Sequence, residues 1–187
     1  MDIRNAPPTI YGDHVARFGE IWKNQAEKLK QKFASSIEEV RMPIDHPVDV
    51  PVIYVKKEAI VDVLRFVKSE PGFEYDFLSD ITATDEEIEP RFEVVYNLYH
   101  LKGSRIRFKV RARDGESVPT LTGVWPAANW VEREVWDMFG IKFAGHPDLR
   151  RILMDERWVG HPLRKDYPLR GYQVFTDSMP IDPKLLT

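Results

Sequence analysis

Residues 92–113 hold two segments in which apolar and polar side chains alternate, separated by Lys102-Gly103-Ser104. Alternation with a period of two is typical of a strand that buries one face, and a short connection containing glycine is typical of a β-hairpin. We therefore expect one strand over Phe92–Leu101 and a second over Arg105–Arg113. A hairpin is not stable alone, so the chain is expected to build a larger, mostly antiparallel sheet with one covered face.

The register of this hairpin decides which side chains meet. If Leu101 lies opposite Arg105, the apolar face pairs Leu98 with Phe108 and Tyr96 with Val110. The polar face then pairs Tyr99 with Arg107, Asn97 with Lys109, and Glu93 with Arg113. A slip by one residue would exchange the two faces.

The segments before the hairpin alternate between helical and extended patterns. Asp13–Phe33 carries an apolar stripe at steps of three and four, with Asp13 as its expected N-cap, and Glu58–Lys68 repeats that spacing. Further strands are expected over Ser36–Arg41, Val50–Lys56 and Phe73–Thr84. This order predicts an α+β fold, a mostly antiparallel sheet with helices on one face.

The character of the chain changes near residue 125. A helix is expected from Ala127 to Phe139, with Gly140 as its stop. Residues 141–187 lack periodicity but are too apolar for a disordered tail, which favours a long extended arm ordered on a partner. We therefore divide the chain into a tail (1–12), an α+β domain (13–125) and a helix with a partner-binding arm (126–187).

Composition excludes several classes of function. The chain has no cysteine, which rules out disulfides, cysteine nucleophiles and cysteine-ligated clusters. Its formal net charge of −3 shows no bias toward nucleic acid. It contains neither a glycine-rich phosphate-binding loop nor an apolar run long enough to span a membrane, and its start lacks a secretory signal. We expect a soluble, cytosolic protein.

Five cations alternate along one expected strand, at Arg105, Arg107, Lys109, Arg111 and Arg113. Such a stripe can hold phosphates. The simpler interpretation, a solvated face neutralised by Glu93 and other acidic neighbours, is preferred because the aromatic motif of RNA-binding sheets is missing.

Two histidines raise the question of a metal. His146-Pro147-Asp148 with His161 has the form of the H-x-D…H triad of non-haem iron enzymes. Both histidines precede proline, however, and the favoured interpretation is that each imidazole hydrogen-bonds a backbone group.

Charged side chains also crowd the expected C-terminal helix. Glu134 and Asp137 are three residues apart and could act as paired carboxylates, while Arg133 is four before Asp137 and could form an ion pair with it. An ion-pair network is the favoured interpretation. The same region concentrates Trp125, Trp130, Trp136 and Trp158 with Arg150, Arg151, Arg157, Arg164 and Arg170, residue types that are enriched at interfaces.

Three blocks of this region together resemble a known family. They are Asn129–Ile141 (NWVEREVWDMFGI), Gly145–Leu153 (GHPDLRRIL) and Gly160–Pro168 (GHPLRKDYP). Upstream, Phe77-Leu78-Ser79-Asp80 and Phe92–Tyr96 fit the same pattern. On these motifs, roughly residues 25–170 resemble the 30 kDa, or C-type, subunit of respiratory complex I, the NADH:quinone oxidoreductase.

The resemblance implies a non-redox scaffold subunit in the peripheral arm of a proton-translocating complex, on the cytoplasmic side of the bacterial inner membrane. It implies no catalytic, metal or cofactor-binding residue here, with FMN, iron–sulfur clusters and quinone held by partner subunits. The implied partners are the 49 kDa, or D-type, subunit, whose surface the arm follows, and the cluster-bearing subunits. The implied interface residues are Glu132, Arg133, Glu134, Asp137, Phe139, Gly140, His146, Pro147, Arg150, Arg151, Ile152, Leu153, Gly160, His161, Pro162, Leu163, Arg164, Lys165, Asp166 and Tyr167.

In this interpretation the helix is locked by ion pairs, within this chain or across to the partner, of Glu132, Arg133, Glu134 and Asp137. Partner carboxylates are met, or the arm is tied down, by Arg150, Arg151, Arg164 and Lys165. Two alternatives stay open. One is the equivalent component of an energy-converting hydrogenase or of a ferredoxin- or coenzyme F420-dependent dehydrogenase. The other is a stand-alone metalloenzyme that uses His146, Asp148 and His161.

Overall fold

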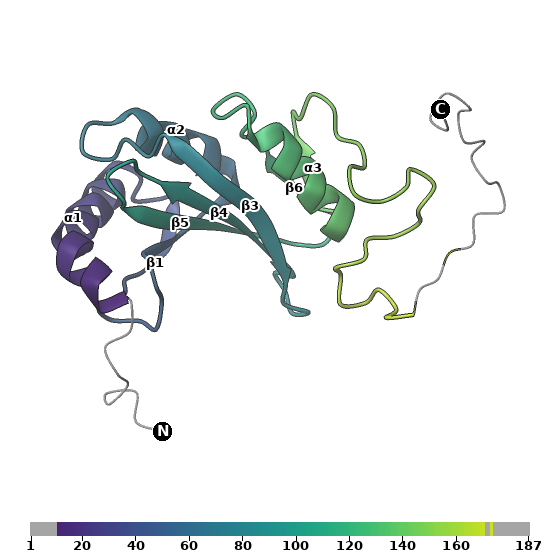
Figure 1. Cartoon of the computed structure of the whole chain (residues 1–187), viewed down its shortest axis with the longest axis horizontal. Helices are drawn as coiled ribbons and strands as arrows, with labels where there is room; N and C mark the ends of the chain where they lie inside the picture. The colour runs from purple at the N-terminus through teal and green to yellow at the C-terminus, as the bar shows by residue number, and fades with distance from the viewer. Residues whose placement is uncertain (1–10, 171–172, 174–187) are drawn as a thin grey trace, which may run out of the picture.

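A five-stranded sheet with the order β1-β2-β5-β4-β3 forms the centre of the molecule (Figure 1). The structure is a computed structural model and describes residues 11–170 and residue 173. The strands are β1 (Ile37–Arg41), β2 (Val52–Val55), β3 (Phe77–Asp85), β4 (Phe92–Tyr99) and β5 (Arg105–Ala112). Within this sheet β2 and β5 run parallel, and the other neighbours are antiparallel.

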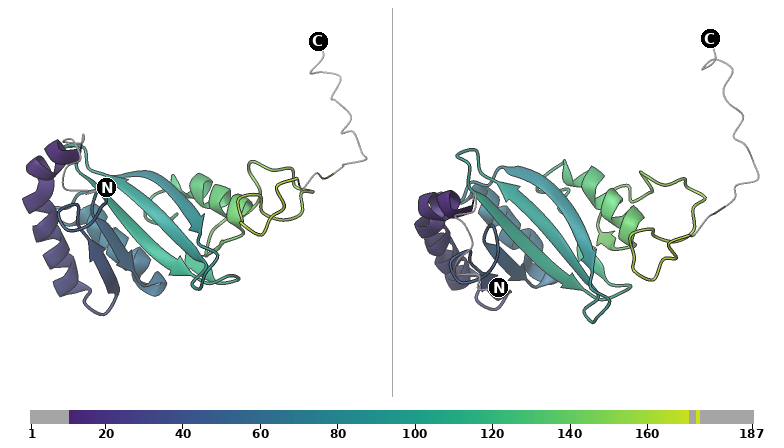
Figure 2. Two further views of the ribbon diagram at one scale, coloured as in Figure 1. Left: turned by 90° about the horizontal axis from the view of Figure 1, so that it is seen from below. Right: turned by 60° about the horizontal axis from the view of Figure 1, so that its bottom comes forward.

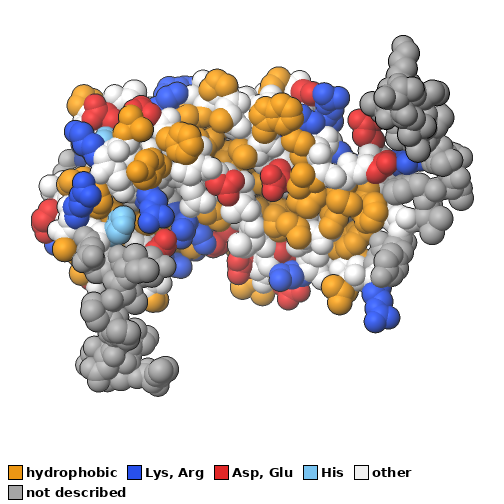
Figure 3. All heavy atoms as spheres, viewed as in Figure 1, with side chains coloured by type: hydrophobic (Ala, Val, Ile, Leu, Met, Phe, Trp, Pro, Cys, Tyr) orange, Lys and Arg blue, Asp and Glu red, His pale blue; other side chains and the backbone are white. Residues whose placement is uncertain are grey.

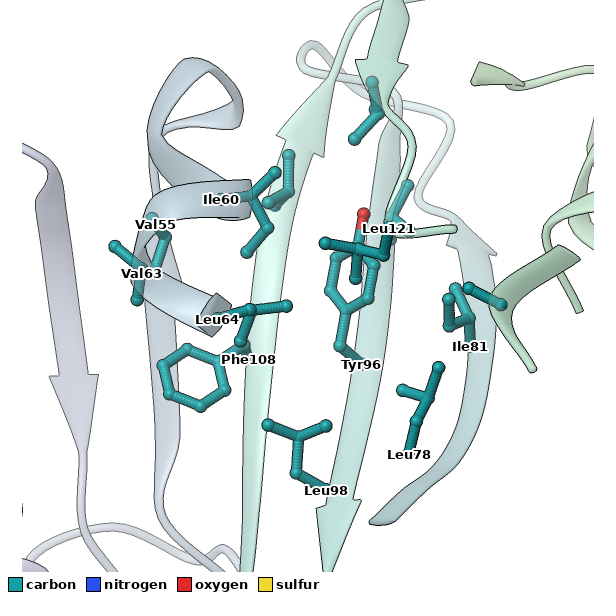
Figure 4. Close-up of a cluster of buried hydrophobic side chains, with 14 of the residues drawn as sticks. Val55, Ile60, Val63, Leu64, Leu78, Ile81, Tyr96, Leu98, Phe108 and Leu121 are labelled. Atoms are coloured by element: carbon teal, nitrogen blue, oxygen red, sulfur yellow. The ribbon is translucent and has the colours of Figure 1, made fainter. Parts of the chain in front are cut away.

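Three helices cover one face of the sheet. They are α1 (Tyr11–Lys32), α2 (Ile60–Ser69), which follows a short 3₁₀ turn at Lys57–Ala59, and α3 (Ala128–Phe139). Buried side chains from each helix join the inward side chains of the strands in one cluster, in which Leu64 of α2 lies beside Phe108 of β5 (Figure 4). The predicted α+β class, with helices on one face of a mostly antiparallel sheet, is confirmed.

The hairpin of β4 and β5 is present, but its predicted register is wrong by two residues. Tyr96 lies opposite Phe108 and Tyr99 opposite Arg105. The three-residue turn is Leu101–Gly103, because the Ser104 carbonyl already accepts the His100 N–H (2.8 Å) and Gly103 adopts a φ of +97°. Glycine takes up the left-handed conformation that ends such a turn. Since the shift is an even number of residues, each side chain keeps its predicted face.

Other differences lie at element ends. Helix α1 includes Tyr11 and Gly12, which were expected in the tail, so Asp13 lies inside the helix and is not its N-cap. Residues 1–10 and most of the segment after residue 170 lie outside the described residues. A second, two-stranded parallel sheet of β6 (Ser117–Pro119) and β7 (Lys142–Ala144) was not expected, because three residues are too few to show a period.

Helix α3 packs against β3, and its buried residues continue the same hydrophobic cluster. The division of the chain near residue 125 stays a prediction. Beyond α3, residues 145–170 form an irregular arm at the end of the molecule opposite α1 (Figures 1 and 2). Among the described residues, no helix is both long and apolar enough to cross a bilayer.

A buried polar network joins α1 to the β4–β5 turn. The Ser104 hydroxyl accepts a hydrogen bond from Trp22 Nε1 (2.9 Å) and shares another with the Tyr75 hydroxyl (2.9 Å). Gln25 Nε2 donates to the Gly72 carbonyl (2.6 Å). These bonds link residues up to 82 positions apart, so they fix the helix against the sheet.

Replacing Ser104 by alanine should therefore destabilise the fold. The substitution leaves the buried Trp22 indole N–H without its acceptor, which costs about 1–3 kcal/mol of unfolding free energy. Urea denaturation measures this loss. Ser79→Ala, at an exposed position of β3, is the matched control, and equal midpoints for the two variants would contradict the role of Ser104.

Candidate partner-binding site

Asp137, near the C-terminal end of α3, organises the arm. Its carboxylate is completely buried. One oxygen accepts from the Arg151 guanidinium, and the other accepts the backbone N–H groups of Ile152 (3.1 Å), Leu153 (2.9 Å) and Met154 (2.9 Å). One side chain thus satisfies the backbone of three consecutive residues that belong to no strand or helix.

The surroundings keep this carboxylate ionised. Burial alone would raise the pKa of Asp137, but the three backbone donors and Arg151 outweigh it and bring the pKa below its ordinary value of 3.8. The group is therefore charged at neutral pH, which keeps its hydrogen bonds to the arm charge-assisted.

Two arginines add further bonds between α3 and the arm. Arg133 donates to the carbonyls of Arg150 (3.1 Å) and Arg151 (3.0 Å). Arg151 also donates to the carbonyls of Trp158 (2.7 Å) and Gly160 (2.9 Å). Arg151 therefore links two segments of the arm, its own and that of residues 158–160, to the Asp137 carboxylate on the helix.

The two candidate metal-binding histidines lie far apart. His146 Nε2 is 3.1 Å from the Asn129 carbonyl, and His161 Nδ1 is 2.9 Å from the Asp137 carbonyl. Eight residues of helix separate these carbonyls, or about 12 Å, too far for one metal ion to span. The predicted imidazole–backbone bonds are confirmed, and no group of three potential ligands comes together within the described part of the chain.

Glycine is required where the arm turns back on α3. Gly140 adopts a φ of +80°, and a Cβ at this position would lie 2.7 Å from Cδ2 of His161. Gly160 has a φ of +92°, and a Cβ there would lie 2.8 Å from the Tyr167 ring. The Leu163 N–H donates to the Met138 carbonyl (3.0 Å), so this part of the arm is also tied to the helix.

A second group of charges, which we call the distal clasp (Asp85, Arg91, Asp114, Arg164 and Asp166), holds the arm farther along. Arg91 pairs with the buried Asp85 (2.8 Å) and with Asp166 (3.0 Å), while Arg164 pairs with Asp114 (2.5 Å). The hydrogen bond from Arg91 lowers the pKa of Asp85 to about 2. The clasp connects the arm to the ends of β3 and β5.

Glu132 is buried in a different environment, on the side of α3 that faces the sheet. It accepts hydrogen bonds from the Thr120 hydroxyl (2.5 Å) and the Leu121 N–H (2.6 Å), and no cation among the described residues forms an ion pair with it. Burial raises the pKa of Glu132 to about 7, against the lowering effect of these two bonds. Burial, and secondarily the charge of Glu132, also raises the pKa of Tyr96.

These contacts correct the predicted ion-pair network on α3. Asp137 pairs with Arg151 and not with Arg133, which binds carbonyls instead. Glu134 is exposed whereas Asp137 is buried, so the two do not form a pair of cooperating carboxylates. The predicted tethering role is confirmed for Arg151 and Arg164. Arg150 is exposed and pairs with neighbouring Asp148 (2.9 Å), and Lys165 contributes its backbone N–H to Asp85 (2.9 Å).

The remaining signature residues divide between packing and exposure. Phe139 is buried, and Ile152 and Pro162 are half-buried. Pro147, Leu153 and Leu163 are exposed, as is Trp130, whereas Trp125 is buried and donates its indole N–H to the Asp76 carbonyl (2.8 Å). Hydrophobic side chains gather at this end of the molecule (Figure 3). The arm is thus fixed from within, and it carries exposed apolar side chains among the charged ones.

The cationic strand does not form a phosphate-binding stripe. Lys109 pairs with Glu93 (2.6 Å), Arg107 with Asp49 (3.2 Å), and Arg111 with Glu39 (3.3 Å). The predicted neutralisation by Glu93 and other acidic neighbours is confirmed for these three residues, whereas Arg105 forms no ion pair with any described residue. Sequence reasoning named Arg164 and Asp166 but missed their partners Asp85, Arg91 and Asp114, which lie at strand ends far away in the sequence. It also missed the bond of Thr120 to Glu132, because no local pattern shows that these two residues meet.

Comparison with known proteins agrees with this architecture. Residues 53–173 match the family model described as "Respiratory-chain NADH dehydrogenase, 30 Kd subunit". A relative from Rhizobium meliloti, named as a second C-type subunit of NADH-quinone oxidoreductase, is 58% identical over 121 residues, which are 64% of this chain and 66% of the relative. Its namesake from Rhizobium etli is 50% identical over 147 residues, or 78% of this chain and 76% of the relative.

Two further comparisons extend the picture. A fused C/D protein of NADH-quinone oxidoreductase from Bdellovibrio bacteriovorus is 44% identical over 160 residues, which are 84% of this chain and 28% of that longer protein. A solved trypsin-resistant fragment of Nqo5 has a TM-score of 0.57 and 29% identity, covering 69% of this chain and 99% of the fragment. The geometry defines a small α+β domain whose irregular arm is fixed to it by charged side chains and carries exposed leucines. The chain belongs to the family of 30 kDa subunits of respiratory-chain NADH dehydrogenase.

Removing the charge of Asp137 should release the arm. In Asp137→Asn, Arg151 loses its carboxylate, and breaking such a buried pair costs about 3–5 kcal/mol. Trypsin should then cut after Arg150 or Arg151 at least roughly tenfold faster. Asp148→Asn, which alters an exposed partner of Arg150, is the control, and indistinguishable cleavage rates would argue against the tether.

Glu132 should make stability depend on pH. Its folded pKa of about 7 exceeds the ordinary 4.5, so the folded state holds this proton more tightly. Its contribution to stability is complete below pH 4.5 and is lost as the pH rises through 7, by up to about 3 kcal/mol. Denaturation of the wild type and of Glu132→Gln at pH 5 and pH 8 should show the variant gaining relative stability at pH 8. A constant difference would refute this assignment.

Proposed function

We propose that this chain is a non-redox scaffold subunit of the peripheral arm of a proton-translocating NADH:quinone oxidoreductase, and that residues 145–170 dock on a 49 kDa-type (D-type) partner near the quinone-reducing module. The observation that carries the proposal is the combination found in the arm. Its backbone is fastened by Asp137 and the distal clasp, while Leu153 is 60% and Leu163 is 53% exposed.

Fixing an irregular segment that exposes leucines costs free energy, and nothing offsets this cost if the segment faces only water. Irregular backbone needs hydrogen-bond partners, and here they come from buried charged groups. Exposed leucines held in fixed positions lose little conformational entropy when a partner covers them, which favours binding. A preorganised apolar surface of this kind suits a permanent interface within an assembly.

The fused relative supports the choice of partner. A protein named as C/D joins both parts in one chain, and chain fusion suits segments that lie next to each other in a complex. The names of the other relatives favour the NADH complex over a hydrogenase-type assembly.

The proposal assigns the redox chemistry to other subunits. FMN, iron–sulfur clusters and quinone would be held by partners, and this chain would hold no cofactor and no catalytic residue. It would sit on the cytoplasmic side of the bacterial inner membrane, held there through the complex.

Substituting exposed residues of the arm should impair assembly without unfolding the chain. In Leu153→Asp combined with Leu163→Asp, two charges would be buried against the partner, so the amount of assembled complex should fall at least roughly tenfold. Blue native electrophoresis of membranes measures assembly, and NADH:quinone activity is then expressed per assembled complex. That specific activity should stay within about twofold, because the changes touch no cofactor.

Ile44→Asp is the matched control, since Ile44 is 51% exposed in the loop between β1 and β2. It should assemble normally. Normal assembly of the arm variant with lost turnover would overturn the scaffold role. A tagged full-length chain that co-purifies with no D-type partner from gently solubilised membranes would overturn the choice of partner.

A further inference from the structure

The end of the molecule opposite the arm carries a groove that no part of the proposed function uses. Two hollows of about 500 and 420 Å³ lie on either side of Phe18, between α1, the β4–β5 turn and the 72–75 loop. Arg17 and Phe18 line both hollows, so the two adjoin each other at these side chains. We call the pair of hollows the basic groove.

Cations line the basic groove without carboxylate partners. Arg17, Lys102 and Arg105 are exposed, and among the described residues none of them forms an ion pair. Arg17 instead makes a long contact with the Lys102 carbonyl (3.5 Å) and lies 4.9 Å from the centre of the Phe18 ring. His14 and His100 also line the hollows, and Glu74 is the one acidic residue that the structure describes in the lining.

The lack of carboxylate partners distinguishes Arg105 from the other cations of strand β5. Lys109 and Arg111 of β5 are half-buried and paired with glutamates, whereas Arg105 at the start of that strand lines the groove and pairs with no described carboxylate. Three cations without a described carboxylate partner, Arg17, Lys102 and Arg105, therefore lie together at this end of the molecule, where Lys, Arg and His side chains gather over α1 (Figure 3).

Apolar side chains accompany the charge. Leu101, in the turn, is 77% exposed, and Ile21, which lines the groove on α1, is 46% exposed. The rim is held in place by the Trp22–Ser104–Tyr75 network directly beneath it. A concave surface with unpaired cations and apolar anchors complements a peptide that carries both carboxylates and apolar residues.

We propose that the basic groove binds an acidic, amphipathic segment of a second protein, so that the chain joins two partners through its opposite ends. Carboxylates of that segment would meet Arg17, Lys102 and Arg105, and its apolar residues would cover Leu101 and Ile21. A membrane surface is a poorer match, because a bilayer presents its charge on a flat face and cannot enter the hollows beside Phe18.

Photo-crosslinking from position 101 tests this inference in the assembled complex. A photoreactive amino acid replaces Leu101 in the full-length chain, the complex is irradiated in isolated membranes, and the crosslinked peptide is sequenced by mass spectrometry. The expected product is a peptide of another protein that is rich in Asp and Glu. Arg17→Glu together with Arg105→Glu should reduce its yield roughly tenfold, since two attractions become repulsions.

Arg113→Glu is the matched control, because Arg113 is 73% exposed just beyond the other end of β5. It should leave the yield unchanged. A crosslink to residues 1–10 of this chain, to phospholipid or to a peptide without acidic residues would overturn the inference, as would no crosslink. The test does not depend on the arm, since assembly is measured separately by the Leu153 and Leu163 variants.

Discussion

The start of the arm depends on one buried carboxylate, that of Asp137. Asp137 binds three consecutive backbone N–H groups and one guanidinium, which replaces the ladder of hydrogen bonds that a strand would supply. Backbone groups buried without partners are costly, so irregular chain can cover α3 only where side chains satisfy it. Arg133 and Arg151 complete this arrangement from the donor side, by binding carbonyls. The helix therefore serves as a template for the segment that follows it.

The two faces of the sheet use charge differently. The covered face is apolar, apart from Glu132 beside the Tyr96 hydroxyl. On the open face, Tyr54 is only 2% exposed because Arg41 and Arg111 lie over its ring at 4.8 and 4.2 Å. The guanidinium groups of these paired arginines thus cover an apolar ring. Arg17, Lys102 and Arg105, which form no ion pair among the described residues, instead line the basic groove.

Sequence patterns predicted this fold well where they act locally. The stripe of α1, the alternation of β4 and β5, and Gly140 as the stop of α3 have local causes, and the structure confirms them. The hairpin register failed by two residues because glycine can end the turn or lie within it. The charged motif was recognised, but its pairing was not: Asp137 finds Arg151 fourteen residues away. Spacing along a helix does not reveal a partner supplied by irregular chain.

The parallel pairing of β2 with β5 has a consequence for biosynthesis. Strand β5 lies between β2 and β4, so the two earlier hairpins, β1–β2 and β3–β4, leave the ribosome before the strand that joins them. Long-range pairing of this kind is slow. The hydrogen bond from Trp22 to Ser104 also cannot form until residue 104 has been synthesised. Helix α3 and the arm are synthesised after all five strands. The core cluster, to which α3 contributes buried side chains, can therefore close only after α3 has been made, and residues 145–170 follow it.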